Sequence, residues 1–337
     1  MDTLRPNDFS RFTDFDIHST PYKTASTHPI TADVLVPSTL TKSATPSPTP
    51  SSPPPASPRP LLLRFHGGGL VAGSSLFPGF FAPWHLSLAA RHSAIIVTPN
   101  YRLLPEASLP EILADIEDFW VWVHEALPSF VEERTNGAVR VDTSRILTAG
   151  DSAGGYLSLL LALRHPDAVR AATAAYPMVD VRSPHFCEAY DKPMFGVPQQ
   201  PRSVVDEHVE KVRSGALPAV VSADPALERA TLMFACVQHG VLGRAFPRER
   251  RDLALLEALA DGARFPRGGV FVWHARGDSV VPIEGSRRLE EMVRELDPGL
   301  GFRLYQGQGE HGFDLDTSIE EDWMADGLQP VVAAWLA

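Results

Sequence analysis

The sequence predicts an α/β protein with a mostly parallel, doubly wound sheet and a helical cap inserted in the second half of the chain. Three observations support this fold class. Short apolar runs alternate with helical patterns, as they do in parallel strands joined by helices. Two of these runs lead directly into glycine-rich loops. Residues 178–247 contain helix-like pieces broken by prolines, and they separate two predicted parts of the core.

The first predicted strand covers residues 30–36, where apolar and polar residues alternate as in an exposed edge strand. Residues 37–60 follow, with nine prolines among Ser, Thr and Ala. A stretch of this composition cannot form a core, so we expect an extended, mobile insertion on the surface. A docking site for a proline-binding partner is the alternative interpretation.

Later strands are predicted where a short apolar run stands before a loop or between helical patterns: residues 60–65, 95–97, 145–149, 171–175, 269–273 and 302–305. The alanine-rich run 171–175 is ambiguous by propensity, but its position between a helix and Pro177 favours a strand. Three helices are also expected. Good helix formers fill residues 156–163, and apolar residues lie on one helical face in 112–127 and 289–296.

Residues 150–154, Gly-Asp-Ser-Ala-Gly, have the pattern of a nucleophile elbow. A strand that turns sharply into a helix projects the central side chain outward, and small flanking residues relieve the crowding of the turn. Ser152, held over a helix N-terminus, could therefore serve as an acyl-transfer nucleophile. An ordinary glycine-rich turn is the alternative interpretation of this pattern.

A second motif, His-Gly-Gly-Gly at residues 66–69, directly follows the strand predicted at 60–65. Acyl transfer needs backbone N–H donors aimed at the oxyanion, and glycines let the backbone approach closely. A phosphate-binding loop is the alternative, but neither G-x-G-x-x-G nor Gly-Lys-Ser/Thr is present. Together, the two motifs and their order along the chain indicate an acyl-transfer site.

An acid and then a histidine are expected after the nucleophilic serine. Asp278 follows the strand predicted at 269–273, and His311 lies in the loop after the last predicted strand. Both loops could reach Ser152 at one edge of a parallel sheet. His311 would act as general base, and Asp278 would fix its tautomer and stabilise the imidazolium.

Each of these two assignments has rivals in the sequence. His66 and His274 are alternative bases, although His66 is better placed to hydrogen-bond within its own glycine loop. Glu284 and Glu310 are alternative acids. Glu284 lies in the next helical pattern, and Glu310 adjoins the histidine, an awkward position from which to orient its ring.

These segments, with Tyr-Arg-Leu-Leu-Pro-Glu at residues 101–106, resemble the hormone-sensitive-lipase-like carboxylesterases of the α/β-hydrolase fold. The resemblance spans roughly residues 60–315. It implies a triad of Ser152, Asp278 and His311, and an oxyanion hole formed by the N–H groups of Gly67, Gly68 and Ala153. It also implies that 101–106 buttress the active-site loops. Leu70 follows the glycines where the family often has an aromatic residue, and we expect this difference to alter the acyl pocket.

The resemblance also implies a division of the chain into a core and a cap. We expect residues 30–177 and 248–337 to form the core, 178–247 to form the cap, and 1–29 to pack into the cap. Aromatic side chains after the glycine loop and beside His311 could line an apolar substrate pocket: Phe77, Phe80, Phe81, Trp84 and Phe313.

The resulting prediction is a serine hydrolase that cleaves a small-molecule carboxylic ester of short or medium acyl chain through an acyl-enzyme. Amide, lactone or thioester cleavage remains an alternative, as in an aryl formamidase or in an enzyme releasing a biosynthetic product. Elimination or transacylation is another, as in some plant relatives. A non-catalytic small-molecule receptor is an alternative of a different class, which the intact triad disfavours.

Composition limits the kinds of molecule that this protein is expected to bind. Lysine and arginine total 30 against 41 acidic residues, a formal charge of −11, and no compensating basic stretch is evident, so nucleic-acid and anionic-membrane binding are not expected. Cys187 and Cys236 are expected to be free thiols. No cofactor or metal is predicted, and neither a signal core nor a membrane span is found. We therefore expect a soluble cytoplasmic protein, with homo-oligomerisation left open.

Overall fold

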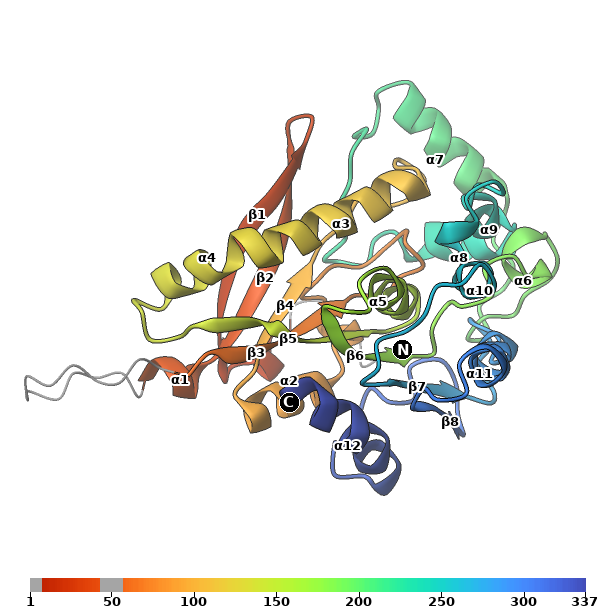
Figure 1. The fold of residues 1–337 in the computed structure, drawn as a ribbon. Coiled ribbons are helices and arrows are strands. Elements are labelled where there is room, and N and C mark those ends of the chain that lie inside the picture. Colours follow the sequence, from red (N-terminus) through yellow and green to blue (C-terminus); the bar gives the residue numbers. More distant parts are fainter. Residues whose placement is uncertain (1–7, 43–56) are drawn as a thin grey trace, which may run out of the picture.

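The computed structural model describes residues 8–42 and 57–337 (Figure 1). Its strands are β1 (Phe15–Ala25), β2 (His28–Pro37), β3 (Arg59–Phe65), β4 (Ile95–Pro99), β5 (Val141–Gly150), β6 (Val169–Ala175), β7 (Val270–Ala275) and β8 (Phe302–Gly307). Within the described residues they form one sheet in the order β1-β2-β4-β3-β5-β6-β7-β8. β3 to β8 run parallel, and β2 is antiparallel to both β1 and β4.

Helices cover both faces of this sheet. The α-helices of the described residues are α1 (Ser38–Lys42), α2 (Pro83–His92), α3 (Leu109–Glu125), α4 (Leu127–Arg134), α5 (Ala153–Arg164), α6 (Pro184–Cys187), α7 (Ser203–Arg213), α8 (Ala230–Gln238), α9 (Val241–Arg244), α10 (Leu255–Ala260), α11 (Glu284–Leu296) and α12 (Asp322–Leu336). In Figure 1, α3 and α5 lie above the sheet, and α2 and α12 lie below it. The fold is therefore the doubly wound α/β arrangement that the alternating pattern predicts.

Each face of the sheet has its own hydrophobic core. Phe119 of α3 and Leu159 of α5 belong to the core above the sheet. Trp84 of α2 and Trp335 of α12 belong to the core below it. The central strands consist almost entirely of buried residues, because helices cover both of their sides. This explains why they appear in the sequence as continuous apolar runs.

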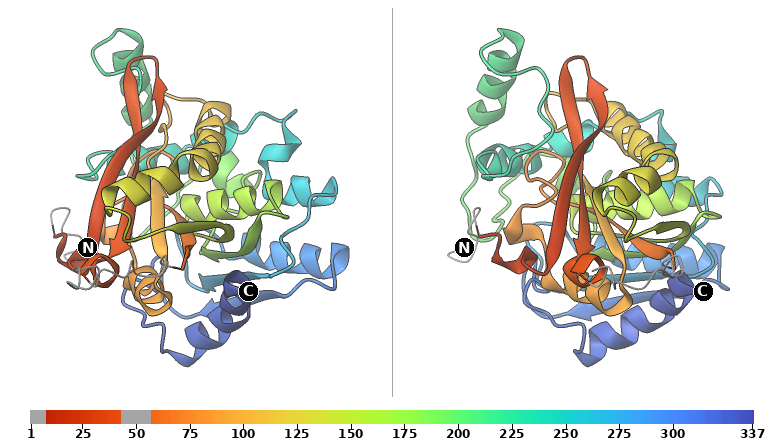
Figure 2. Two further views of the ribbon diagram at one scale, coloured as in Figure 1. Left: turned by 60° about the vertical axis from the view of Figure 1, so that its left-hand side comes forward. Right: turned by 90° about the vertical axis from the view of Figure 1, so that its left-hand side faces the viewer.

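One expectation about the N-terminal part is wrong. The strand predicted at 30–36 is not an exposed edge, because β1 pairs with β2 along its length and residues 32–37 are buried. Residues 15–25 form β1, and the expectation that residues 1–29 pack into the cap stays a prediction. Figure 2 shows the long β1–β2 hairpin rising toward the end of the molecule that carries α7. There His28 Nε2 and Ser222 Oγ are 2.8 Å apart.

Only the ends of the proline-rich stretch 37–60 belong to the described part of the chain. Residues 38–42 form α1, whose Ser38 hydroxyl donates to Asp16 at 2.8 Å. Arg59 begins β3. Residues 43–56, and with them most of the predicted mobile insertion, lie outside the described residues.

The segment between β6 and β7 contains α6 to α10, and α6 to α9 gather at one end of the sheet (Figure 1). Cys187 and Cys236, both in this segment, are not disulfide-bonded. Of the helices in the described ranges, none combines the length and the hydropathy needed to cross a bilayer.

Candidate active site

Ser152 occupies the sharp turn between β5 and α5. Its backbone has φ 57° and ψ −116°, a conformation that L residues rarely adopt. Neighbouring main chain holds it there: its N–H donates to Ala175 O at 2.9 Å, and its carbonyl accepts from Met178 N–H at 3.1 Å. The side chain projects into a cavity at the carboxyl end of the parallel strands. A strained serine at this position has the geometry of a nucleophile elbow.

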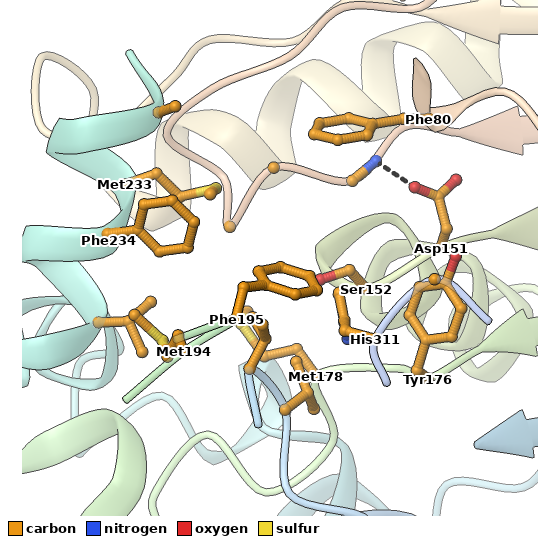
Figure 3. A pocket seen from close by; sticks show the side chains of 18 of the residues that line it. Phe80, Asp151, Ser152, Tyr176, Met178, Met194, Phe195, Met233, Phe234 and His311 are labelled. Atoms are coloured by element: carbon orange, nitrogen blue, oxygen red, sulfur yellow. Dashed lines mark hydrogen bonds between the residues drawn. The ribbon is translucent and has the colours of Figure 1, made fainter. Parts of the chain in front are cut away.

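His311 and Asp278 lie on the loops that follow β8 and β7, and they contact each other. His311 Nδ1 and Asp278 Oδ2 are 2.7 Å apart. Because an ionised carboxylate only accepts hydrogen bonds, Nδ1 carries the proton and Nε2 is left free to accept one. Ser152 and His311 line the same cavity, and Figure 3 shows them together. Three residues that are far apart in the sequence thus come together at the carboxyl end of the parallel strands.

The Asp278 side chain is buried, and both of its oxygens have polar partners. Its Oδ1 accepts the backbone N–H groups of Val280 at 2.9 Å and Val281 at 2.8 Å. Its Oδ2 lies 3.1 Å from His274 Nε2 in addition to the contact with His311. Burial alone would raise the pKa of this carboxyl, but His311 and His274 outweigh it and hold the pKa well below its usual range. Asp278 is therefore ionised across the neutral range.

His66 and His274, the rival bases, are engaged elsewhere. His274 is fully buried, with Nε2 2.8 Å from Val281 O and Nδ1 2.8 Å from Ser286 Oγ. His66 Nδ1 lies 2.8 Å from Gly67 O, and burial lowers the pKa of His66 to about 3. His66 is thus a neutral part of its loop, as its sequence position predicts.

The rival acids also have other roles. Glu310 Oε1 accepts the backbone N–H groups of Ser279 at 2.6 Å and His311 at 2.8 Å, so this carboxylate joins the two loops. Glu284 is exposed at the start of α11.

The glycine loop is tied to the elbow by a buried ion pair. Asp151 Oδ1 accepts from Arg64 Nη2 at 2.7 Å. Its Oδ2 accepts from Gly67 N–H at 2.9 Å, the dashed line in Figure 3. A Cβ on Gly67 would lie 2.5 Å from Asp151 Oδ2, so this approach requires glycine. Burial raises the pKa of Asp151 to about 6, although Arg64 and Gly67 oppose the rise.

This contact corrects one predicted oxyanion donor. The N–H of Gly67 is already used by Asp151 and is not free for a substrate. In the described parts of the chain, no acceptor is recorded for the N–H groups of Gly68, Gly69 or Ala153. The N–H groups of Gly68 and Ala153 are thus free, as the predicted oxyanion hole requires, and the N–H group of Gly69 is free as well.

Tyr101 supports the same loop from behind. Its hydroxyl donates to His66 O at 2.7 Å, and its ring stacks on the His66 imidazole with centroids 4.3 Å apart. Arg102 forms charged hydrogen bonds with Asp115 and Glu111. This is the buttressing role expected of residues 101–106.

The cavity has a volume of about 320 Å³ and is mostly apolar. Its aromatic side chains include Phe80, Phe186, Phe195 and Phe234. Three methionines, Met178, Met194 and Met233, line it as well. Many of these residues belong to the segment between β6 and β7, which therefore forms one wall.

Most of the predicted pocket aromatics do not reach this cavity. Phe80 lines it, but Phe77, Phe81 and Trp84 are almost completely buried in the fold. Phe313 packs against Gly307 and the Trp323 ring instead. The prediction is wrong for these four because an aromatic cluster that follows a loop is more often core than pocket.

Several site residues have no signal in the sequence. Phe195 and Met233 come from a proline-broken segment without a motif, and Arg64 lies inside an apolar strand. Only the His274–Asp278 spacing, at the end of a predicted strand, could have suggested a second histidine beside the acid.

Comparisons with known proteins agree with this fold. A family model described as an alpha/beta hydrolase fold matches residues 62–229. A probable carboxylesterase from Phoma sp. is 30% identical over 338 residues, covering 97% of this chain and 98% of that protein. A non-reducing polyketide synthase from Preussia isomera is 25% identical over 341 residues, covering 94% of this chain and 14% of the synthase. The structure of a thermostable esterase from Pseudomonas putida aligns with a TM-score of 0.57 at 17% identity, covering 96% of this chain and 84% of the esterase.

Proposed function

This chain belongs to the hormone-sensitive-lipase-like carboxylesterase family of the α/β-hydrolase fold, and we propose that it hydrolyses a carboxylic ester with Ser152, His311 and Asp278 as its triad. The observation that carries the proposal is the 2.7 Å contact between His311 Nδ1 and Asp278 Oδ2 beside the strained serine. These residue types in this arrangement form the machinery of serine acyl transfer.

In the first half-reaction, Ser152 Oγ attacks the ester carbonyl carbon while His311 Nε2 takes the serine proton. The carbonyl oxygen becomes an oxyanion, which accepts the N–H groups of Gly68, Gly69 and Ala153. Asp278 stabilises the imidazolium without taking its proton. The ester C–O bond then breaks, the leaving alkoxide receives the proton from His311, and an acyl-enzyme remains.

Water completes the cycle. His311 Nε2 takes a proton from a water molecule, whose oxygen attacks the acyl carbon and forms a second oxyanion. The bond to Ser152 Oγ breaks, and the imidazolium returns its proton to the serine. The products are one carboxylic acid and one alcohol.

A short or medium acyl chain suits the site best. Its volume of about 320 Å³ lies at the small end of the roughly 300–1,000 Å³ range of ligand pockets. The wall contributed by residues 178–247 supports the proposal that this segment is a cap on a core of 30–177 and 248–337.

The test is hydrolysis of p-nitrophenyl acetate, butyrate and decanoate by the wild type and by Ser152→Ala. We expect a short-chain or medium-chain optimum and a loss of several orders of magnitude in kcat without the serine. A Ser152→Ala activity within about tenfold of wild type would refute the triad. A wild type that reacts stoichiometrically with a fluorophosphonate but hydrolyses none of these esters would have a competent serine and a more selective pocket.

Thioester cleavage is a second candidate. Nearly the whole chain aligns with one part of a polyketide synthase, and the proposed triad is equally suited to a thioester carbonyl. Matched oxygen esters and N-acetylcysteamine thioesters of the same acyl group separate the two. Thioesters are intrinsically more reactive than oxygen esters. A thioester-to-ester ratio of kcat/KM that exceeds the ratio of the uncatalysed hydrolysis rates would favour this second function.

A further inference from the structure

Phe195 sits at the tip of a tight turn above the candidate active site. Val197 N–H donates to Met194 O at 2.8 Å and closes the turn. Both residues at its tip are left-handed, Phe195 with φ 51° and Gly196 with φ 69°. Glycine adopts this region freely, whereas a phenylalanine there is conformationally unfavourable.

Core packing does not explain the strained phenylalanine. Its side chain is 40% exposed, although it lines the cavity that contains Ser152. A large apolar residue that is both strained and half-exposed is stabilised by neither its backbone nor burial. Such outliers are typical of functional sites.

Phe195 contacts both sides of the site. Its ring lies edge-on to His311, with centroids 6.1 Å apart, and edge-on to Phe234 of α8, at 6.5 Å. Its N–H donates to Ser279 Oγ at 2.9 Å, next to the acid Asp278. Figure 3 shows the ring beside Ser152, between the serine and α8. A substrate bound to the serine would therefore meet this ring.

The rest of the cavity disfavours a charged substrate. Among its described lining residues, the acidic and basic side chains are Asp151 and His311. Asp151 is already paired with Arg64 and Gly67 N–H. A charged group bound beyond the reacting atoms would be desolvated without a partner. The aromatic rings and methionine thioethers around it instead suit an aromatic group.

We propose that Phe195 is a specificity-determining residue that recognises an aromatic ring of the substrate, so that the preferred substrate is an uncharged ester with an aromatic group next to the scissile bond. This inference rests on the proposed esterase function. The ring can belong to the acyl or to the alcohol portion, and the experiment distinguishes the two.

The first measurement is kcat/KM for methyl phenylacetate relative to methyl cyclohexylacetate, two esters of similar size and carbonyl reactivity. A second pair, benzyl acetate and cyclohexylmethyl acetate, carries the ring on the alcohol side. Phe195→Leu keeps apolar bulk without the aromatic ring, and Phe195→Tyr keeps the ring. Phe9→Ala is a control at a phenylalanine that is 47% exposed and does not line the cavity.

We expect Phe195→Leu to lower the phenyl-to-cyclohexyl ratio in one pair by roughly 2- to 12-fold, the usual range for one aromatic contact. Phe195→Tyr and Phe9→Ala should leave the ratio unchanged. The ester pair whose ratio falls shows whether the recognised ring belongs to the acyl or to the alcohol portion of the substrate. An unchanged ratio in both pairs for Phe195→Leu would overturn the proposal. So would equal turnover of methyl phenylacetate and its para-carboxy derivative, because the site would then accept charge.

A binding measurement separates this proposal from the esterase function. In the Ser152→Ala protein, Kd values for the same ester pairs are obtained by ligand-observed NMR without turnover. Tighter binding of the aromatic member, lost in Ser152→Ala/Phe195→Leu, supports aromatic recognition even if the wild type hydrolyses neither ester. Equal Kd values for both members would refute aromatic recognition even if hydrolysis is rapid.

Discussion

Asp151→Asn tests whether burial or ion pairing dominates the charge beside the nucleophile. Asp151 is 6% exposed and contacts Arg64 at 2.7 Å. Burial raises its pKa and Arg64 lowers it, and the net result is a rise from 3.8 to about 6. Asparagine has nearly the same shape but does not titrate, so comparison with the wild type isolates this ionisation.

The sign follows from proton binding. Between pH 4 and 6 the folded protein holds a proton on Asp151 that the unfolded chain has already lost. The contribution of Asp151 to the free energy of unfolding therefore falls as the pH rises through this range. A shift of about two pKa units corresponds to about 2–3 kcal/mol between pH 4 and 7.5. The Asp151→Asn protein lacks this contribution.

The assay is urea unfolding of both proteins from pH 4 to 7.5 at constant salt. We expect the stability of the wild type relative to Asp151→Asn to fall by about 2–3 kcal/mol as the pH rises. A relative stability that rises with pH would mean that Arg64 outweighs burial and would refute the reasoning. Asp142→Asn provides a contrasting control: burial raises the pKa of Asp142, but hydrogen bonds from Ser144 and Arg145 together outweigh it, and the pKa is lowered. The wild-type advantage over Asp142→Asn should therefore stay nearly constant from about pH 5 to 7.5 and shrink only when the pH falls below about 4.

Three further predictions concern the supports of the site. Gly154→Ala should abolish folding or lower the free energy of unfolding by several kcal/mol, because the new Cβ would lie 2.0 Å from Phe65 O. Thermal unfolding of the variant and the wild type measures this loss. His274→Phe removes the imidazole that contacts Asp278. With this partner gone, the Asp278 carboxylate stabilises the His311 imidazolium more strongly, so the acid limb of the kcat/KM profile should shift to higher pH. An unchanged acid limb would contradict this prediction. Burial lowers the pKa of Lys192 to about 8, so between pH 8 and 10 the wild type should gain stability relative to Lys192→Met in urea unfolding, because the unfolded chain binds the extra proton.

The sequence predicts the parallel part of the fold well because each buried strand is a short apolar run with its own loop. β3 leads into the glycine loop and β5 leads into the elbow. The order of strands and motifs along the chain is therefore enough to predict that these two loops lie at the same end of the sheet. β1 is missed because His18, Ser19 and Thr20 give it a polar pattern and Pro21 interrupts it. Its pairing with β2 is a tertiary contact that a local pattern does not encode.

The errors in the predicted site also come from tertiary contacts that a local sequence pattern does not encode. The sequence predicts a glycine loop, but the loss of the Gly67 N–H depends on Asp151, which is 84 residues away. Likewise, the aromatic cluster after the loop is apolar whether it faces a core or a pocket, and only tertiary packing selects Phe80. Phe195 has no motif, because its importance comes from a turn that folds back over the serine.

A short chain of hydrogen bonds joins the Phe195 turn to the proposed triad. Phe195 N–H donates to Ser279 Oγ, and Ser279 N–H donates in turn to Glu310 Oε1 at 2.6 Å. The same Glu310 oxygen accepts His311 N–H at 2.8 Å, and Ser279 adjoins Asp278 in the chain. A substrate that displaces the Phe195 turn therefore pulls on the two loops that position the acid and the base. Binding and chemistry are coupled through these contacts, so substitutions in this turn should alter kcat as well as KM.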